Sequence, residues 1–216
     1  LDALVNNAGT WQGERHLVDL PGCDAGVEFS FAVNHLAPYL LTRRLLPRLL
    51  ESEPARVVTV SSDLHRRASL DLTAVVGADG PAGRTAYALS KLANVLFAYE
   101  LARRLDGTGV TANCVHPGVI TSTDLSRNAS GLSRLGFRLV GLVPGVGTDA
   151  RGGARTSVWA ASSPEVEGVS GRYFVDEEAR RSSDATYDRE AQRRLWAWSA
   201  KAVGLPAELE VDAGGA

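Results

Sequence analysis

The alternation of apolar and polar positions along the chain predicts short strands separated by longer helices. Apolar or β-branched runs that stop at polar or glycine-containing turns are typical of strands, and apolar residues three and four positions apart are typical of helices. Strands are expected at residues 1–5, 56–60, 110–115 and 171–175. Helices are expected at residues 29–50, 85–105, 149–161 and 184–203.

This order of elements predicts the fold class. Strands that alternate with helices build an α/β fold with a doubly wound parallel sheet, as in Rossmann-like domains. The run Arg-Val-Val-Thr-Val at 56–60 fits a strand that is buried on both faces of such a sheet. Residues 63–84 are polar and hold three glycines and a proline, so a loop is expected there. We expect one domain over residues 1–205 and a C-terminal tail at 206–216.

Small and polar residues follow three of the expected strands. They are Asn-Asn-Ala-Gly at 6–9, Ser-Ser at 61–62 and His-Pro-Gly at 116–118. Serine and glycine end many strands simply as turn residues. In a parallel sheet, however, ligands bind at the carboxyl ends of the strands. The joint occurrence of the three clusters therefore favours a site at this edge of the sheet.

Composition and charge exclude several classes of partner. The 216 residues are 44% hydrophobic and 22% charged, which is ordinary for a globular protein. A formal net charge of -2 gives no electrostatic reason to expect a nucleic acid or an anionic membrane. Cys23 and Cys114 form no disulfide framework, and no two His or Cys residues have the spacing of metal ligands. We expect a cytoplasmic protein without a metal site.

Tyr87 and Lys91 carry the clearest candidate chemistry. They are four positions apart in an expected helix, so their side chains share one face. A phenol has a pKa of about 10, and a neighbouring ammonium should lower that pKa toward neutrality. Such a phenol can act as a general acid or base. The pair alone is weak evidence, because this spacing occurs by chance on many helices.

The motifs around this pair resemble the short-chain dehydrogenase/reductase family. Asn-Asn-Ala-Gly, an asparagine inside a helix at 34, Ser-Ser after a strand, Tyr-x-x-x-Lys, and Pro-Gly after the next strand follow one another in the family's order. Tyr-Ala-Leu-Ser-Lys-Leu-Ala-Asn-Val-Leu-Phe at 87–97, Gly-Thr-Gly-Val-Thr at 107–111 followed by His-Pro-Gly-Val at 116–119, and Glu-Gly-Val-Ser-Gly-Arg-Tyr-Phe at 167–174 resemble its retinol-dehydrogenase-like branch. The resemblance covers residues 1–205.

The resemblance implies a catalytic tetrad of Asn34, Ser62, Tyr87 and Lys91. Tyr87 would exchange a proton with the substrate oxygen, Ser62 would hydrogen-bond that oxygen, and Lys91 would tune Tyr87 and bind the nicotinamide ribose. Asn34 would bind a water in a proton relay that includes Lys91. Ser61 is the rival for the serine role, but the branch favours Ser62, which precedes Tyr87 by 25 positions.

The sequence around Asn34 supports its part in that relay independently. Pro38 has no backbone N–H, so the carbonyl of Asn34 loses its hydrogen-bond partner within the helix. A carbonyl freed in this way can hold a water molecule. A helix kink without any further role is the alternative.

The resemblance also implies a nicotinamide cofactor, NADP or NAD, and the branch favours NADP. Hydride would move directly between this cofactor and the substrate carbon. Residues 7–9 would line the adenosine ribose, and residues 117–119 would face the nicotinamide. The expected cofactor contacts are Asn7, Ala8, Gly9, Tyr87, Lys91, Pro117, Gly118, Val119 and Thr121.

Three histidines lie near these motifs, and a structural role is the leading expectation for each of them. His35 follows Asn34 and should point away from the site. His116 precedes Pro-Gly and should pack. His65 lies near the serines and could border the substrate, although a structural role is the simpler interpretation.

The family's glycine-rich phosphate-binding turn does not occur before Asn6, and the chain opens on an expected strand without a methionine. We therefore expect the first strands and that turn to lie outside this sequence, and residues 1–216 alone to be inactive.

Residues 119–148 are expected to form a lid over the substrate. Seven apolar residues between 125 and 142 predict an apolar wall, which fits a lipophilic aldehyde, ketone or alcohol. They could equally pack a short helix onto the body of the domain.

The first functional hypothesis is an oxidoreductase that acts on such a small molecule. A non-catalytic, dehydrogenase-like binding or scaffold protein is the alternative. An extended-type sugar epimerase or dehydratase would need more chain after residue 119. The sequence is compatible with either a monomer or a homo-oligomer.

Overall fold

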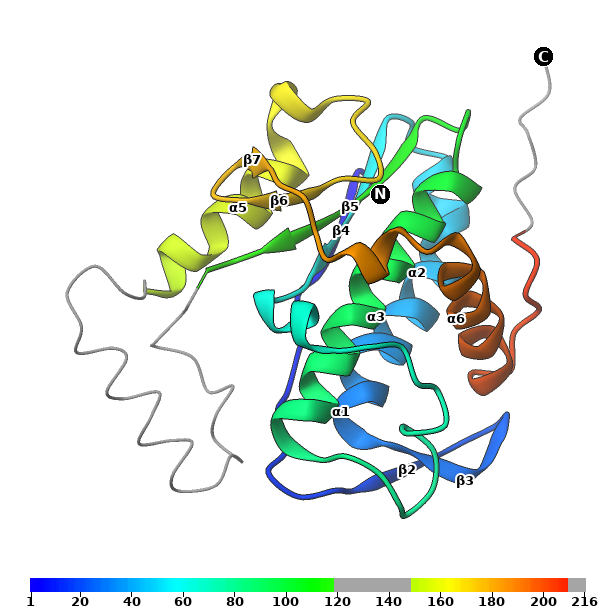
Figure 1. Ribbon diagram of the computed structural model, residues 1–216. Coiled ribbons are helices and arrows are strands. Elements are labelled where there is room, and N and C mark those ends of the chain that lie inside the picture. The colour runs from blue at the N-terminus through cyan, green and yellow to red at the C-terminus, as the bar shows by residue number, and fades with distance from the viewer. Residues whose placement is uncertain (119–148, 210–216) are drawn as a thin grey trace.

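The computed structural model describes residues 1–118 and 149–209. Its centre is a five-stranded sheet in the order β1-β4-β5-β6-β7 (Figure 1). The first four strands are parallel, and β7 runs antiparallel to β6. The strands are β1 (Ala3–Asn6), β4 (Ala55–Val60), β5 (Val110–His116), β6 (Tyr173–Val175) and β7 (Glu178–Ala179).

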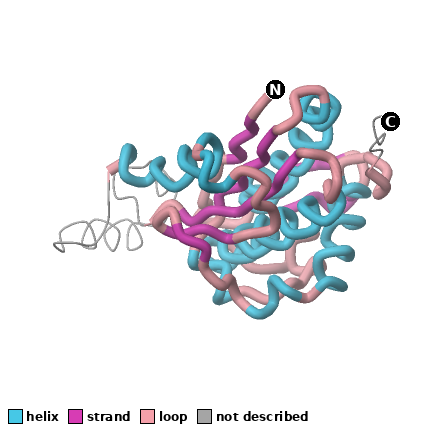
Figure 2. Tube along the Cα trace, turned by 90° about the horizontal axis from the view of Figure 1, so that it is seen from above, coloured by secondary structure: helices cyan, strands magenta, loops and turns pink. Residues whose placement is uncertain are grey.

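Helices cover both faces of this sheet, which confirms the expected α/β architecture (Figure 2). Helix α5 (Ala150–Ser162) lies on one face. Helices α2 (Ala37–Leu50) and α3 (Gly83–Arg104) lie on the other, and α6 (Arg189–Ala202) packs against α3. Among the described helices, none has both the length and the run of apolar residues needed to cross a membrane.

Helix α3 lies at the centre of the molecule. Every residue from Ala86 to Leu101 is buried, because the sheet covers one side of the helix and other helices cover the rest. A helix that is enclosed all round needs no polar face, so its sequence shows little amphipathic pattern. It therefore positions the side chains at its N-terminal end rigidly.

The expected helix at 29–50 forms with an irregular first part. Helix α1 (Phe29–Phe31) runs into a π-helical turn, η1 (Ala32–Leu36), before α2 begins. The N–H of Ala37 bonds to the carbonyl of Ala32, five residues earlier. The wide turn ends just before Pro38, whose missing N–H interrupts the regular pattern.

The helix expected at 184–203 divides into two parts. A 3₁₀ turn, η5 (Asp184–Tyr187), comes first. The Asp188 carboxylate then accepts hydrogen bonds from the N–H groups of Glu190 and Ala191, which starts α6 at Arg189. Trp196 in α6 is buried against Tyr39. Trp198, two positions later, is only partly buried.

The main element that the sequence pattern did not predict is a hairpin formed by β2 (Leu17–Leu20) and β3 (Cys23–Glu28). Gly22 in its turn packs on the end of α6, where its N–H donates to the carbonyl of Ala202 at 3.2 Å. A Cβ atom at Gly22 would lie 1.8 Å from the carbonyl oxygen of Lys201. Only glycine fits at this contact.

Two short 3₁₀ turns also differ from expectation. The expected loop at 63–84 starts with η2 (Asp63–Arg67), and η4 (Pro164–Val166) follows α5. The carbonyl of Ser62 and its side chain begin η2, as described below. Both cysteines are free thiols, as expected.

Candidate active site

The three strand ends with small and polar residues meet at one edge of the sheet. Strands β1, β4 and β5 are neighbours, and their register places Asn6 beside Thr59 and Val60 beside Val115. Helix α3 passes beneath this edge and contributes Tyr87 and Lys91 (Figure 1). The sequence hypothesis of a common site is therefore consistent with the fold.

Lys91 is held below the strand edge with almost no exposure to solvent. Its residue is 3% exposed, and its Nζ donates to the carbonyl of Val60 at 3.0 Å. The side chain of Ser61 donates to the carbonyl of Lys91 at 2.7 Å, which ties α3 to the end of β4. Ser61, itself buried, thus has a structural contact and does not face the site.

Ser62 has the opposite orientation from its neighbour. It is partly exposed, and its Oγ accepts a hydrogen bond from the N–H of Leu64 at 3.3 Å. It also forms a side-chain hydrogen bond with Tyr87. Ser62 therefore contacts Tyr87 through its side chain, and its role as the serine of the tetrad stays a prediction.

Tyr87 is buried under another aromatic ring. Trp11 stacks on it with 5.5 Å between ring centroids and an interplanar angle of 19°. Burial raises the pKa of Tyr87 to about 12, although the hydrogen bond from Ser62 acts in the opposite direction. Lys91 Nζ lies 5.5 Å from the centre of the same phenol ring. The expectation of a pKa lowered toward neutrality is wrong for this structure, because burial of the phenol is the largest influence on this pKa and raises it.

The same desolvation acts on Lys91. Burial lowers the pKa of its ammonium to about 8. Both members of the pair are therefore held nearer to their neutral forms than they would be in water. At neutral pH the phenol keeps its proton and most of the lysine is still charged.

Asn34 connects the loop after β1 to α3. Its fully buried amide accepts from the N–H of Thr10 at 2.7 Å and donates to the carbonyl of Thr10 at 2.9 Å. The amide also donates to Ser90 Oγ at 2.9 Å, and that hydroxyl donates to the carbonyl of Tyr87 at 2.7 Å. Asn34 thus braces the site through its side chain. A water on its backbone carbonyl stays a prediction.

Of the expected cofactor residues after β1, Gly9 lies beside the ammonium of Lys91. Asn7, Ala8 and Gly9 are exposed. A Cβ atom at Gly9 would lie 3.4 Å from Lys91 Nζ and 3.5 Å from Asn34 Oδ1. The lack of a side chain at Gly9 therefore leaves space directly beside the ammonium.

The end of β5 borders the same edge. Pro117 and Gly118 are half-buried, and a Cβ atom at Gly118 would meet no atom of the described residues within 4 Å. The predicted contacts Val119 and Thr121, and the predicted lid at 119–148, lie outside the described residues.

These residues fit the ribose of a nicotinamide nucleotide. An ammonium has three N–H donors, and within the described residues Lys91 uses one acceptor, the carbonyl of Val60. The space left by Gly9 lies beside the remaining donors. A vicinal diol has the acceptors to satisfy them.

The histidines take different structural roles. His35 is fully buried, its Nε2 lies 2.8 Å from Ser199 Oγ, and burial lowers its pKa to about 3. His116 Nε2 lies 3.8 Å from Asp63 Oδ2. His65 contacts Ser62 directly, which the sequence alone did not indicate. Among the residues that the structure describes, no three His, Cys, Asp or Glu side chains are grouped to bind a metal ion.

Trp11 and Arg15 are the site features that sequence reasoning missed. Arg15 donates to the carbonyl of Gly77 at 2.9 and 2.8 Å and to that of Pro81 at 2.7 Å. It fixes the loop that carries Trp11 to the segment before α3. The position of a tryptophan two residues after Gly9, beside a predicted site, was the available signal.

A family model described as short chain dehydrogenase matches residues 1–131. The chain belongs to the short-chain dehydrogenase family. Human Retinol dehydrogenase 14 is 42% identical over 207 residues, which are 95% of this chain and 59% of that protein. Human Polyprenol dehydrogenase is 39% identical, and the match covers 95% of this chain and 62% of that protein. The chain thus spans about three-fifths of the length of these relatives, and it lies in the retinol-dehydrogenase-like branch of the family.

Solved structures of related proteins share the fold. The crystal structure of an uncharacterized protein from Mycobacterium Paratuberculosis superposes with a TM-score of 0.71 at 28% identity, covering 96% of this chain and 69% of the other. A blue fluorescent protein from a metagenomic library, solved in complex with NADPH, superposes with a TM-score of 0.54 at 28% identity. That match covers 82% of this chain and 63% of the other.

Proposed function

We propose that the protein carrying this chain is a nicotinamide-dependent oxidoreductase that interconverts a carbonyl and an alcohol, with Tyr87 as the general acid or base. The observation that carries the proposal is the buried pair of Tyr87 and Lys91, with Ser62 in contact with Tyr87, at the carboxyl edge of the sheet. Relatives at about 40% identity carry the names of dehydrogenases. Within the part of the chain that the structure describes, Lys91 has no carboxylate partner, and a lysine buried in this way has a use in such an enzyme and only a cost elsewhere.

The protonation state of Tyr87 suits the reduction direction at neutral pH. With its pKa raised to about 12, the phenol is protonated and can donate to a carbonyl oxygen. Ser62, which bonds Tyr87, can donate to the same oxygen. In the oxidation direction Tyr87 must first lose its proton, so that direction should accelerate as the pH rises.

Residues around Gly9 would hold the cofactor. Lys91 would donate to the ribose hydroxyls, residues 7–9 would pack beside the nucleotide, and Pro117 and Gly118 would border the nicotinamide. When bound, the nicotinamide supplies or accepts the hydride. Asn34 would keep the loop after β1 in register with α3 while this happens.

We propose a lipophilic substrate and favour NADP over NAD. Retinol and polyprenol, which give the relatives their names, are lipophilic alcohols. The indole of Trp11 supplies an apolar surface directly against Tyr87. A structural neighbour was solved with NADPH.

The test is turnover by the full-length gene product. NADPH and NADH consumption would be followed by absorbance with long-chain and short-chain aldehydes at equal concentration. We expect turnover with NADPH and a higher kcat/KM for the long-chain aldehydes. Measurable cofactor binding without turnover of any carbonyl or alcohol would favour the scaffold alternative. Preference for short polar substrates would contradict only the lipophilic assignment.

A further inference from the structure

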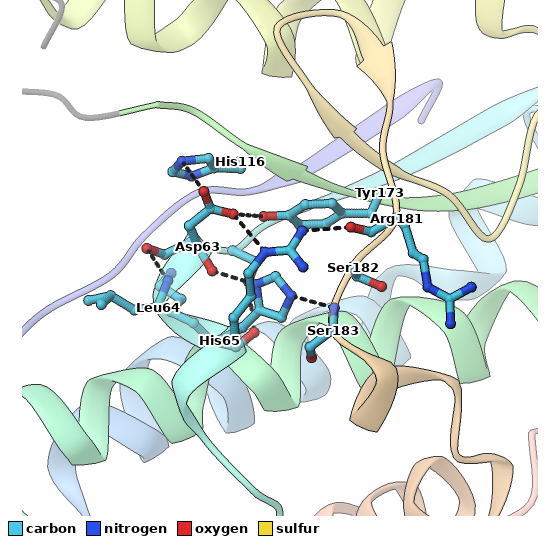
Figure 3. A network of polar contacts seen from close by, with 12 residues as sticks. Asp63, Leu64, His65, His116, Tyr173, Arg181, Ser182 and Ser183 are labelled. Atoms are coloured by element: carbon cyan, nitrogen blue, oxygen red, sulfur yellow. Dashed lines mark hydrogen bonds and ion pairs between the residues drawn. The ribbon is translucent and has the colours of Figure 1, made fainter. Parts of the chain in front are cut away.

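His65, in the 3₁₀ turn η2, is fully buried, and both of its ring nitrogens have a hydrogen-bond partner (Figure 3). Nδ1 lies 2.7 Å from the carbonyl oxygen of Ser62, and Nε2 lies 3.0 Å from the backbone nitrogen of Ser183. A backbone N–H can only donate, so Nε2 must be the acceptor. The ring proton therefore sits on Nδ1 and is donated to the carbonyl of Ser62.

The hydrogen bonds that described backbone N–H groups donate to Ser62 all come from this turn. Its carbonyl accepts a second hydrogen bond from the N–H of His65 at 3.0 Å. Its Oγ accepts from the N–H of Leu64 at 3.3 Å. The direction in which the Ser62 hydroxyl meets Tyr87 thus depends on how η2 is held.

The other partner of His65 is firmly anchored. Ser182, next to Ser183, is 2% exposed, and its Oγ lies 2.8 Å from the hydroxyl of Tyr99 and 2.6 Å from Thr186 Oγ1. Tyr99 belongs to α3, twelve residues after Tyr87, or about 18 Å along the helix. A path of hydrogen bonds therefore runs from Ser62 through His65 and the 182–183 segment back to the helix that carries Tyr87.

The surroundings of His65 keep its ring in this state. The ring of Tyr173, on β6, packs edge-on at 5.1 Å between centroids. The titratable and charged groups that face His65 are Asp63 and Arg66 on its own turn and His116 on β5. Burial is the largest influence and lowers the pKa of His65, so the ring stays neutral at neutral pH.

We propose that His65 is a positioning residue for Ser62: its ring braces the Ser62 turn against the anchored 182–183 segment and so sets the serine hydroxyl against Tyr87. The proposal rests on the proposed function, since it assigns His65 to the same reaction. It needs no contact between His65 and the substrate. A purely structural histidine would stabilise the protein without any specific link to Ser62.

The two contacts of His65 can be removed separately. In His65→Asn, the amide nitrogen takes the place of Nδ1 and can still donate to the carbonyl of Ser62, but nothing reaches Ser183. In His65→Gln, the longer side chain can accept from Ser183, but it no longer donates to Ser62. Each variant loses one buried hydrogen bond and the ring contact with Tyr173, so both should lose similar stability.

The activities of the two variants should differ. We expect His65→Asn to keep kcat within about threefold of wild type. We expect His65→Gln to lose about 10- to 100-fold in kcat, because small displacements of a reacting group carry losses of that size. Cofactor KM should stay unchanged in both, since His65 lies outside the cofactor residues. The measurement is steady-state kinetics of the full-length gene product, with urea unfolding of each variant beside it.

A double-mutant cycle with Ser62→Ala isolates the link. If His65 acts through Ser62, adding His65→Gln to Ser62→Ala should change kcat by less than about twofold. Arg66→Gln is the matched control, because Arg66 joins η2 to the same segment through the carbonyl of Arg181 at 2.6 Å without contacting Ser62. It should keep kcat.

Three outcomes would overturn the positioning role of His65 and leave the proposed function intact. They are equal loss of kcat in the Asn and Gln variants, a full Gln effect on the Ser62→Ala background, and a loss in Arg66→Gln as large as in His65→Gln. A wild-type protein that binds cofactor but turns over no carbonyl or alcohol would overturn the proposed function, and the role of His65 with it.

Discussion

The two ends of helix α3 each bury a charged side chain, and they do so in opposite ways. Lys91, near the N-terminal end, is 3% exposed and has one carbonyl as its described hydrogen-bond partner. Glu100, about two and a half turns later, is 4% exposed and contacts two guanidinium groups, those of Arg103 and Arg104. The second arrangement balances its charge within the helix, whereas Lys91 has no carboxylate partner among the described residues. Burial alone therefore does not distinguish the proposed site from the other end of the helix, but the described counter-charges do.

The largest expected effect is at the end of the helix that carries Lys91. Tyr87→Phe removes the proton donor but keeps the ring that stacks on Trp11. We expect kcat to fall by about 10²- to 10⁴-fold with unchanged stability and cofactor affinity. Steady-state kinetics and cofactor titration of the full-length gene product provide the check. Wild-type turnover in this variant would remove Tyr87 from the mechanism.

Lys91→Met should separate activity from stability. Activity and nucleotide affinity should fall, because the ribose donors are lost. Stability at pH 7 should rise by up to about 3 kcal/mol, since a pKa held at about 8 instead of 10.5 is a cost of that order. The carbonyl of Val60 stays satisfied, because Asn94 Nδ2 also donates to it at 3.1 Å. Urea unfolding of the cofactor-free protein measures the change, and a clear loss of stability would contradict the comparison.

The same lysine predicts a pH window. Between about pH 8 and pH 10.5 the unfolded chain keeps the Lys91 proton while the folded protein releases it. The unfolded state then binds more protons, so the stability of the wild type rises with pH in this window. From pH 7 to pH 9.5 the gain relative to Lys91→Met should be about 2 kcal/mol. Urea unfolding curves of the wild type and of Lys91→Met at both pH values test this prediction. A difference in stability between the two proteins that does not change with pH would refute it.

A substitution at Glu100 should have the reverse result of Lys91→Met: stability should fall and kcat should stay unchanged. Glu100→Gln leaves Arg103 and Arg104 without their shared carboxylate, so we expect a loss of about 1 to 3 kcal/mol in stability. Both guanidiniums are partly exposed, which limits the loss. Tyr87 is thirteen residues away, about 20 Å along the helix, so kcat should stay at the wild-type value. Thermal melts paired with kinetics test this, and a kcat loss would link the two ends.

Local sequence predicted the parts of the site that depend on spacing. Tyr87 and Lys91 share a helix face because they are four positions apart, and the irregular turn at Asn34 follows from Pro38. These two features need only the geometry of one element. The preference for Ser62 over Ser61 came from the resemblance to the family, and its role stays a prediction.

The features that the sequence predicted wrongly or did not predict depend on contacts between residues far apart in the sequence. The pKa of Tyr87 is set by burial beneath Trp11, which comes from a loop 76 positions earlier. The bracing of Asn34 by Thr10, and of His65 by Ser183, joins segments that no local pattern relates. The β2–β3 hairpin had a local signal in Pro21-Gly22, since a Pro-Gly pair between β-type runs marks a turn.

The contact of Gly22 with the end of α6 sets an order of events during synthesis. The carbonyl groups on which the hairpin turn rests belong to residues 201 and 202, about 180 residues downstream. At about 5 to 20 residues per second, the ribosome adds them at least several seconds after the hairpin has been made. For that time the hairpin turn lacks its support on α6, although β3 can already bond to residues 75–77. Nascent chains arrested before α6 should therefore be cut by protease near Pro21 and Gly22, and released chains should be protected there.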